Sequence, residues 1–265
     1  MANGLITLTT DFGTADHFVG TMKGVILGIV RRARIVDITH EIAPYELNEA
    51  AFVIAQAWSY FPKGTVHVVV IDPGVGSARR PILAEARGQY FIAPDNGVLS
   101  MIYAAAPTKV RVISNAKLMG KQVSRTFHGR DIFAPAAAHL AHGVPAARFG
   151  KTIADPVRSF LLKPTQLSRR DWSGAVLKVD RFGNLITNLH IDDFPEVKTR
   201  PIELRVGLER IHRLALTYSE TAIGELAAIV GSSGYIEVAA NQNSAAKLLG
   251  CGAGAPVELE IFYDS

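Results

Sequence analysis

The chain has 265 residues, of which 48% are hydrophobic and 20% are charged; this composition indicates folded cores and excludes a disordered chain. The formal net charge is only +4 and the basic residues are scattered along the sequence, which argues against nucleic acid as a partner. The single cysteine, Cys251, excludes an internal disulfide and fits a reducing compartment.

The amino-terminal residues show no secretory signal, because a short strand pattern begins at Leu5. The longest apolar stretches are well short of the ~20 residues that a membrane-spanning helix needs. We therefore expect a cytoplasmic protein that does not associate with a membrane.

Strand-like and helix-like segments alternate through the first part of the chain. Strand composition is seen at 5–10, 34–38 and 66–71, and apolar residues recur at helical spacing over 17–32 and 47–61. Further strands are predicted at 82–86, 90–93 and 110–114, and further helices at 98–105 and 132–142. Because parallel strands need crossover connections, this order predicts an α/β domain with a largely parallel or mixed sheet.

The pattern changes near the middle of the chain, where prolines and charges replace the helical period. We predict an α/β domain over residues 1–155, a linker over 156–171 and a second domain over 172–265. In the second domain helical patterns nearly vanish, and turn-forming residues separate strands predicted at 174–179, 185–189, 202–206, 211–217, 225–230, 235–238 and 257–262. That pattern predicts a small all-β barrel.

The predicted strand 66–71 ends at an acidic residue, Asp72, because Pro73 cannot donate to a ladder and glycines follow. Arg79 comes shortly after this loop, and the first strand also ends at an aspartate, Asp11. Open α/β sheets bind ligands at the carboxyl ends of their strands, so these side chains are candidates for a site. The alternative is that Asp72 caps its own turn and Arg79 lies on the surface.

A third polar junction, at His128, precedes the alanine-rich helix 132–142. Asp, His and Arg together could activate a water, with the carboxylate stabilising positive charge, the imidazole relaying a proton and the guanidinium holding an anion or the carboxylate. The alternative is that His128 only caps the helix. Several such groups converging at one sheet edge are better evidence for a site than any one of them, but on the residues alone helix capping remains the favoured interpretation of His128.

The residue pattern predicts no metal site. His139 and His142 lie three apart on one predicted helix, but no third ligand has a recognisable spacing. The loop Gly74-Val75-Gly76 lacks the Gly-Lys-Ser/Thr of a phosphate-binding loop and the third glycine of a dinucleotide fingerprint. A metallohydrolase that acts on a nucleotide is kept as an alternative enzyme class.

In the second domain, the run from Asp180 to Asn188 places a carboxylate, an aromatic ring and amides around one turn. A purine would stack on Phe182 and hydrogen-bond to Asn184; the alternative is a hairpin turn with a buried Phe182. The run Ser232-Ser233-Gly234-Tyr235 could bind a carboxylate through hydroxyls and backbone amides, or serve only as a turn.

Six runs, which span both predicted domains, can be read together: Thr10-Asp11-Phe12-Gly13, Asp37-Ile38-Thr39-His40, Asp72-Pro73-Gly74-Val75-Gly76, Ala93-Pro94-Asp95-Asn96-Gly97, Thr126-Phe127-His128-Gly129-Arg130-Asp131 and Asp180-Arg181-Phe182-Gly183-Asn184. In this order they resemble the S-adenosyl-L-methionine hydrolases (hydroxide adenosyltransferases), relatives of the bacterial fluorinase and chlorinase. The resemblance implies an N-terminal α/β domain joined to a C-terminal β-barrel, S-adenosyl-L-methionine as the partner, and no cofactor. It also implies a homotrimer with each active site between the N-terminal domain of one subunit and the C-terminal domain of a neighbour.

The resemblance assigns roles by position. The family's catalytic Asp, Arg and His fall on Asp72, Arg79 and His128. Its contacts to the ribose fall on Asp11 and Tyr45. Its contacts to the methionine end fall on Asp180 and Ser232. Its adenine pocket falls on Phe182, Asn184 and Tyr218. Ser233 stands where the halogenases place an Arg, so this contact to the methionine carboxylate differs. Tyr45 replaces a Trp of the halogenases and is expected to keep its packing role.

The implied reaction is attack of water on C5′ of S-adenosyl-L-methionine, which gives adenosine and L-methionine. The sulfonium leaves as a neutral thioether and needs no general acid, whereas water needs a nearby base and in-line alignment. A halogenase needs a neutral pocket instead, and the Asp72 carboxylate would repel a halide in a desolvated site. Hydrolysis is therefore favoured over two alternatives, halogenation and binding of adenosine or S-adenosyl-L-methionine without catalysis.

Overall fold

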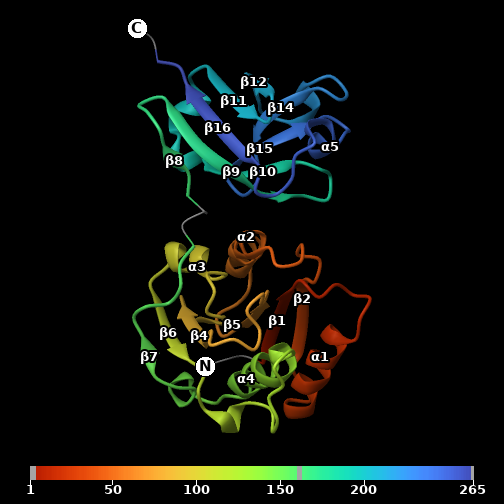
Figure 1. The fold of residues 1–265 in the computed structure, drawn as a ribbon, viewed down its shortest axis with the longest axis vertical. Coiled ribbons are helices and arrows are strands. Elements are labelled where there is room, and N and C mark those ends of the chain that lie inside the picture. The colour runs from red at the N-terminus through yellow and green to blue at the C-terminus, as the bar shows by residue number, and fades with distance from the viewer. Residues whose placement is uncertain (1–3, 160–162, 264–265) are drawn as a thin grey trace. The chain divides into compact units, whose positions relative to one another are not determined.

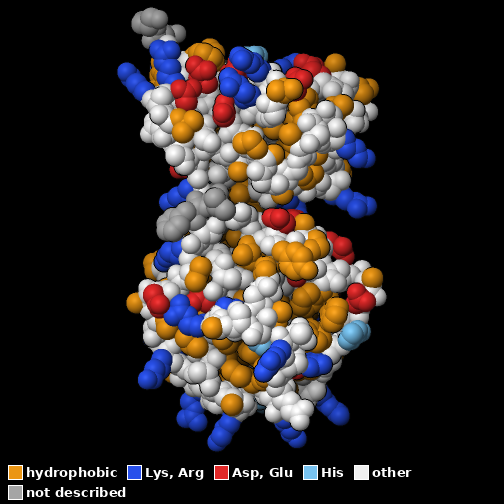
Figure 2. All heavy atoms as spheres, viewed as in Figure 1, with side chains coloured by type: hydrophobic (Ala, Val, Ile, Leu, Met, Phe, Trp, Pro, Cys, Tyr) orange, Lys and Arg blue, Asp and Glu red, His pale blue; other side chains and the backbone are white. Residues whose placement is uncertain are grey.

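The computed structural model describes residues 4–159 and 163–263. The chain divides between Ser159 and Phe160 into two compact units, each with its own sheet (Figure 1). In the described part of the chain no helix is both long and apolar enough to cross a bilayer. On the face drawn in Figure 2, Lys and Arg side chains are dispersed over both units among acidic and apolar ones.

The first unit is built on a mixed sheet. Its strands are β1 (Leu5–Thr10), β2 (Arg34–Thr39), β3 (Val66–Val70), β4 (Pro81–Ala86), β5 (Gln89–Pro94), β6 (Thr108–Val112) and β7 (Thr152–Ile153). Their order across the sheet is β2-β1-β3-β5-β4-β6-β7. The first four of these are mutually parallel, and β4, β6 and β7 pair antiparallel with their neighbours.

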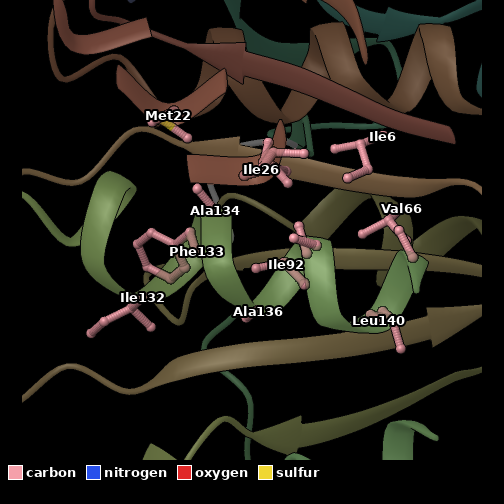
Figure 3. Packing of buried hydrophobic residues seen from close by; sticks show 14 of the residues in the cluster. Ile6, Met22, Ile26, Val66, Ile92, Ile132, Phe133, Ala134, Ala136 and Leu140 are labelled. Carbon is pink, nitrogen blue, oxygen red and sulfur yellow. The ribbon is translucent and has the colours of Figure 1, made fainter. Parts of the chain in front are cut away.

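Helices cover both faces of this sheet (Figure 1). α1 (Phe18–Ile29) and α4 (Ala134–Ala141) pack on one face, and α2 (Leu47–Ala57) and α3 (Ser100–Ala105) pack on the other. The alanines of α4 belong to the same buried cluster as Ile92 of β5 (Figure 3). The small alanine side chains allow α4 to pack closely on the sheet.

The second unit is a mostly antiparallel sheet that curls into a half-barrel. Its order is β12-β11-β16-β9-β10-β15-β14-β13, with β8 paired to β9. Its elements are β8 (Thr165–Gln166), β9 (Asp171–Val179), β10 (Leu185–His190), β11 (Ile202–Val206), β12 (Glu209–Ile211), β13 (Leu214–Ala215), β14 (Leu226–Val230), β15 (Tyr235–Ala240), α5 (Ala245–Leu249) and β16 (Pro256–Ile261).

The predicted fold class is confirmed: a mixed α/β unit precedes a curled all-β sheet. The single strand predicted at 211–217 is wrong, because β12 forms a hairpin with β11 whereas β13 pairs parallel with β14.

The short helix α5 was not predicted, since five residues are too few to show a helical period. Its caps define it instead: Ser244 Oγ accepts the backbone N–H of Lys247, and Gly250 ends the helix at φ 61°.

The predicted linker lies partly outside the described residues, which exclude 160–162. Just before them, Arg80 Nη1 donates to Asp155 Oδ1 at 3.0 Å. Asp95 Oδ1 accepts the backbone N–H of Val157 at 2.8 Å. Both contacts tie the end of the first unit to its sheet, and the limits 156 and 171 of the linker stay a prediction.

Candidate active site

Two aspartates lie at the same edge of the first sheet. β1 and β3 are parallel neighbours with Thr10 opposite Val70, so the residues that follow both strands, Asp11 and Asp72, emerge together. Burial raises the pKa of the Asp11 carboxyl, and the charge of Asp72 raises it further. Hydrogen bonds from the backbone of Tyr45 and of Asp11 itself lower this pKa and partly offset the rise. The parallel pairing thus brings two carboxylates to the same edge of the sheet.

The loop after Asp72 folds back and brings Arg79 against it. Successive turns bond the backbone N–H of Val75 to the Asp72 carbonyl at 3.1 Å and that of Ser77 to the Gly74 carbonyl at 3.1 Å. Arg79 Nε then donates to Asp72 Oδ1 at 2.8 Å, and Nη2 donates to Oδ2. The side chains of Arg79 and Asp72 are only 9% and 6% exposed, so this is a desolvated, bidentate ion pair.

The loop is fixed from outside by a close backbone approach. Gly76 has φ 77°, and a Cβ at this position would lie 2.3 Å from the carbonyl oxygen of Arg125. A side chain at Gly76 would therefore clash with the segment that leads to His128 and would also be strained. The segments carrying Asp72 and His128 meet at this glycine.

His128 completes the cluster from the π-helical turn Gly129–Phe133 that precedes α4. Arg79 Nη2 contacts His128 Nδ1 at 2.6 Å; because a guanidinium can only donate, Nδ1 accepts and the neutral ring carries its hydrogen on Nε2. Burial lowers the pKa of His128, and the Arg79 charge lowers it further, while Asp72 opposes this effect. The imidazole is therefore neutral at pH 7.

A cavity of about 360 Å³ opens in front of these groups. Three phenylalanines form one wall, with ring centroids 5.7 Å apart for Phe12 and Phe18 and 5.1 Å apart for Phe18 and Phe127. The lining residues are Asp11, Phe12, Phe18, Pro44, Tyr45, Val70, Asp72, Val75, Thr126, Phe127, His128 and Gly129. The cavity thus combines an apolar wall with a carboxylate and an imidazole, as ligand sites do.

Tyr45 lies at the rim of this cavity in a strained conformation. Its φ is 71°, which a non-glycine residue rarely adopts. Its backbone N–H donates to Asp11 Oδ2 at 3.0 Å, and the ring is exposed. Strain of this kind persists where surrounding structure requires it, often at functional sites.

Sequence reasoning missed part of this cavity. Phe18 and Gly129 were not singled out, although Gly129 follows His128 directly. A Cβ at Gly129 would lie 3.1 Å from Met22 Sδ and 3.2 Å from the Phe127 ring. The motif around His128 carried this signal, but only the fold shows that Gly129 lets the aromatic wall close.

A second cavity, of about 700 Å³, lies in the C-terminal unit. The turn from Asp180 to Asn184 forms one side, and its aspartate holds it: Oδ1 accepts the backbone N–H groups of Phe182 and Asn184, each at 2.9 Å, and Oδ2 accepts Asn184 Nδ2 at 2.9 Å. The lining residues are Asp180, Phe182, Asn184, Tyr218, Ala240, Gln242, Asn243, Ser244 and Lys247. Four of the predicted substrate-binding residues therefore converge.

Phe182 is 77% exposed, so the alternative of a hairpin turn with a buried Phe182 is wrong. An exposed ring beside a cavity is available for stacking. Ser232 lies in the exposed turn between β14 and β15 and does not line this cavity. Its role stays a prediction.

In residues 4–159 and 163–263 no three His, Cys, Asp or Glu side chains converge in a metal-binding arrangement. His139, on α4, has a pKa lowered by burial and by the neighbouring His142. The two histidines thus form no ligand set within this part of the chain.

Comparison with known proteins identifies relatives over nearly the whole chain. Residues 6–150 match the model of the SAM hydroxide adenosyltransferase N-terminal domain, and residues 174–258 match that of the C-terminal domain. An (R)-S-adenosyl-L-methionine hydrolase of Salinispora tropica is 40% identical, over 92% of this chain and 93% of the relative. A fluorinase of Actinoplanes sp. is 30% identical, over 90% and 91%.

A crystal structure of an uncharacterized conserved protein from Thermotoga maritima has the same fold. The TM-score is 0.88 at 37% identity, and the match covers 96% of this chain and 99% of that one. The likeness therefore extends over both units.

Proposed function

The chain belongs to the SAM hydroxide adenosyltransferase family, and on that premise we propose that it hydrolyses S-adenosyl-L-methionine to adenosine and L-methionine. The names of its hydrolase relatives specify the (R)-sulfonium epimer, which we take as the substrate. The observation that carries the proposal is the desolvated Asp72–Arg79 ion pair in contact with His128, beside a cavity with an aromatic wall.

Water attacks C5′, the C5′–S bond breaks, and its electron pair leaves with sulfur as a neutral thioether. Adenosine, methionine and one proton are the products. The attacking water becomes cationic as it bonds to carbon, so a fixed negative charge beside it lowers the barrier. No group is needed to protonate the leaving sulfur.

Asp72 is the better proton acceptor of the cluster. A carboxylate offers about four lone-pair positions, and Arg79 occupies one on each oxygen. His128 has Nδ1 occupied by Arg79 and a hydrogen on Nε2, so its neutral ring has no free acceptor. His128 therefore orients Arg79, and Arg79 orients Asp72 toward water.

Halogenation is the second candidate, because a fluorinase is among the relatives. It requires a halide to replace water at the same place. The Asp72 carboxylate lies at that place, paired with Arg79; its oxygens can accept hydrogen bonds from water, whereas a halide would face a group of like charge. The site residues therefore favour water.

Substrate binding is assigned by the same reasoning. Asp11 and Tyr45 would hold the ribose at the first cavity, where the half-buried Asp11 carboxylate can accept hydrogen bonds from hydroxyl groups. Adenine would stack on Phe182 beside Asn184 and Tyr218, and Asp180 and Ser232 would contact the methionine end. From the family resemblance we also propose a homotrimer in which each site is shared between neighbouring subunits, without a metal or cofactor.

The test is incubation of the protein with each sulfonium epimer, followed by chromatography for adenosine. We expect adenosine from the (R) epimer, unchanged by a chelator. Binding of the substrate without adenosine would favour a non-catalytic binding protein, and loss of activity in chelator would favour the metallohydrolase.

A further inference from the structure

A buried carboxylate in the C-terminal unit has no role in the mechanism above. Glu237 lies on β15, opposite Ile229 of β14, and is 6% exposed. It shares its face of the sheet with a small apolar cluster of Ala215, Ala227, Ile229 and Ala239. A carboxylate in such surroundings is costly unless hydrogen bonds and an opposite charge compensate for it.

Within the described residues Glu237 has little compensation. Its side-chain hydrogen bond comes from Tyr218 Oη at 3.4 Å, which is long. Burial raises its pKa, and the charge of Asp180 raises it further. The turn backbone closes over it, because a Cβ on Gly231 would lie 1.8 Å from Oε1.

Another buried carboxylate of this unit shows the contrast. Glu203 lies 3.0 Å from Arg205, 3.4 Å from Arg210 and 3.8 Å from His212. These cations lower its pKa, led by the hydrogen bond from Arg205, whereas the pKa of Glu237 is raised. Glu203 is thus paired with arginines, whereas the ion pairs found among the described residues include none to Glu237.

Glu237 is joined to the 700 Å³ cavity by two of its lining residues, Tyr218 through a hydrogen bond and Asp180 through their mutual charge. A ligand that carries an N–H cation at this end would supply both the charge and the donors that Glu237 lacks. The sulfonium of the proposed substrate cannot do so, because it carries no N–H. The α-ammonium of its amino-acid end can donate three hydrogen bonds.

We propose that Glu237, together with Asp180, is a specificity-determining residue that selects ligands bearing the α-ammonium group of an amino-acid end. The inference rests on the proposed function for the identity of the ligand. A ligand without the ammonium leaves the two carboxylates unneutralised at the cavity, so the site discriminates against nucleosides that lack this group.

The test compares ligands that cannot be hydrolysed, so that binding is measured without turnover. S-adenosyl-L-homocysteine carries the ammonium but no sulfonium, its decarboxylated form keeps the ammonium alone, and 5′-methylthioadenosine has neither amino-acid group. Isothermal titration of the full-length protein is compared for the wild type, Glu237→Gln and Glu258→Gln. Glu258 is an exposed carboxylate of the same unit and serves as the matched control.

Glu237→Gln keeps an acceptor for Tyr218 and removes only the charge. We expect it to weaken binding of the two ammonium ligands by about 10- to 100-fold, as for a lost charged hydrogen bond, and to change 5′-methylthioadenosine by less than about threefold, with no effect from Glu258→Gln. If Glu237→Gln fails to fold, Glu237→Asp should weaken the same two ligands to a smaller extent.

An equal loss for all three ligands, or no loss, overturns the inference, as does a wild-type protein that prefers 5′-methylthioadenosine. Failure of the wild type to form adenosine would reject the proposed hydrolysis alone, because the binding series does not depend on turnover.

Discussion

Replacing Arg79 by Lys should separate the geometry of the cluster from its charge. Arg79 donates to both oxygens of Asp72 and to Nδ1 of His128. Its guanidinium also stacks 5.2 Å from the centroid of the Phe133 ring. A lysine keeps the positive charge but has a single nitrogen, which cannot reach Asp72 in bidentate form and His128 at once.

The magnitude follows from these contacts. The substitution removes about two hydrogen bonds to charged groups, each worth roughly 1.5 to 3 kcal/mol, and lysine replaces part of this with one hydrogen bond of its own. The free energy of unfolding should therefore fall by about 3 kcal/mol. For a unit of this size that corresponds to a fall in Tm of roughly 6 to 12 °C. Turnover should fall by at least ~10²-fold, because a displacement of about 1 Å costs that much.

Thermal unfolding and adenosine formation should be measured on Arg79→Lys and on Arg80→Lys as the matched control. Arg80 pairs with Asp95 at 2.6 Å and with Asp155 at 3.0 Å and does not line the cavity. Arg80→Lys should lose some stability with turnover nearly unchanged. Turnover of Arg79→Lys within about threefold of wild type, or an equal loss in both variants, would refute the reasoning.

Asp72→Ala should reduce turnover by ~10²-fold or more while the substrate still binds; turnover within about threefold of wild type would remove Asp72 from the mechanism. Subunits carrying Asp72→Ala and Asp180→Ala, unfolded and refolded together, should regain activity if sites are shared; hybrid trimers that stay inactive would place each site within one chain. In molar chloride the wild type should form no 5′-chloro-5′-deoxyadenosine by mass spectrometry, and Asp72→Ser should weaken hydrolysis without giving an efficient halogenase. Ready formation of the chlorinated product by the wild type would reverse the electrostatic argument. His67, bonded to Thr7 at 2.8 Å and Gln89 at 2.7 Å, has a pKa lowered by burial to about 4. The unfolded state therefore binds more protons between pH 6.5 and 4, and the free energy of unfolding should fall by roughly 3 kcal/mol as the pH drops through that window. Denaturant titrations that show the same fall in His67→Gln would assign it to other groups.

The sequence indicated Asp11 and Asp72 as neighbours because strand ends are local features and parallel pairing follows from the alternation of elements. It also indicated the turn around Phe182, although only the fold distinguishes an exposed ring from a buried one. Glu237 was missed because one polar residue in a strand pattern carries no sign of what lies over it. Its surroundings, in which the described residues offer no ion pair, depend on β14, β15 and Tyr218, which are brought together only by folding.

The strands β12 and β13 also show that local sequence does not predict strand pairing. Residues 211–217 have the composition of one strand, and local composition does not reveal that the chain changes partners there. The π-helical turn before α4 is likewise invisible to helical period, although it places His128. Long-range pairing and irregular turns thus account for most of what sequence reasoning missed.

The contact between Gly76 and Arg125 limits how this site can be redesigned or recombined. A side chain at Gly76 would fit only if the backbone at Arg125 moved away. A chimera that takes residues 72–80 from a relative and keeps the native 120–131 segment would combine two loops whose shapes are not complementary at this contact. The unit of exchange between related enzymes is therefore the pair of loops together, although some forty residues of sequence separate them.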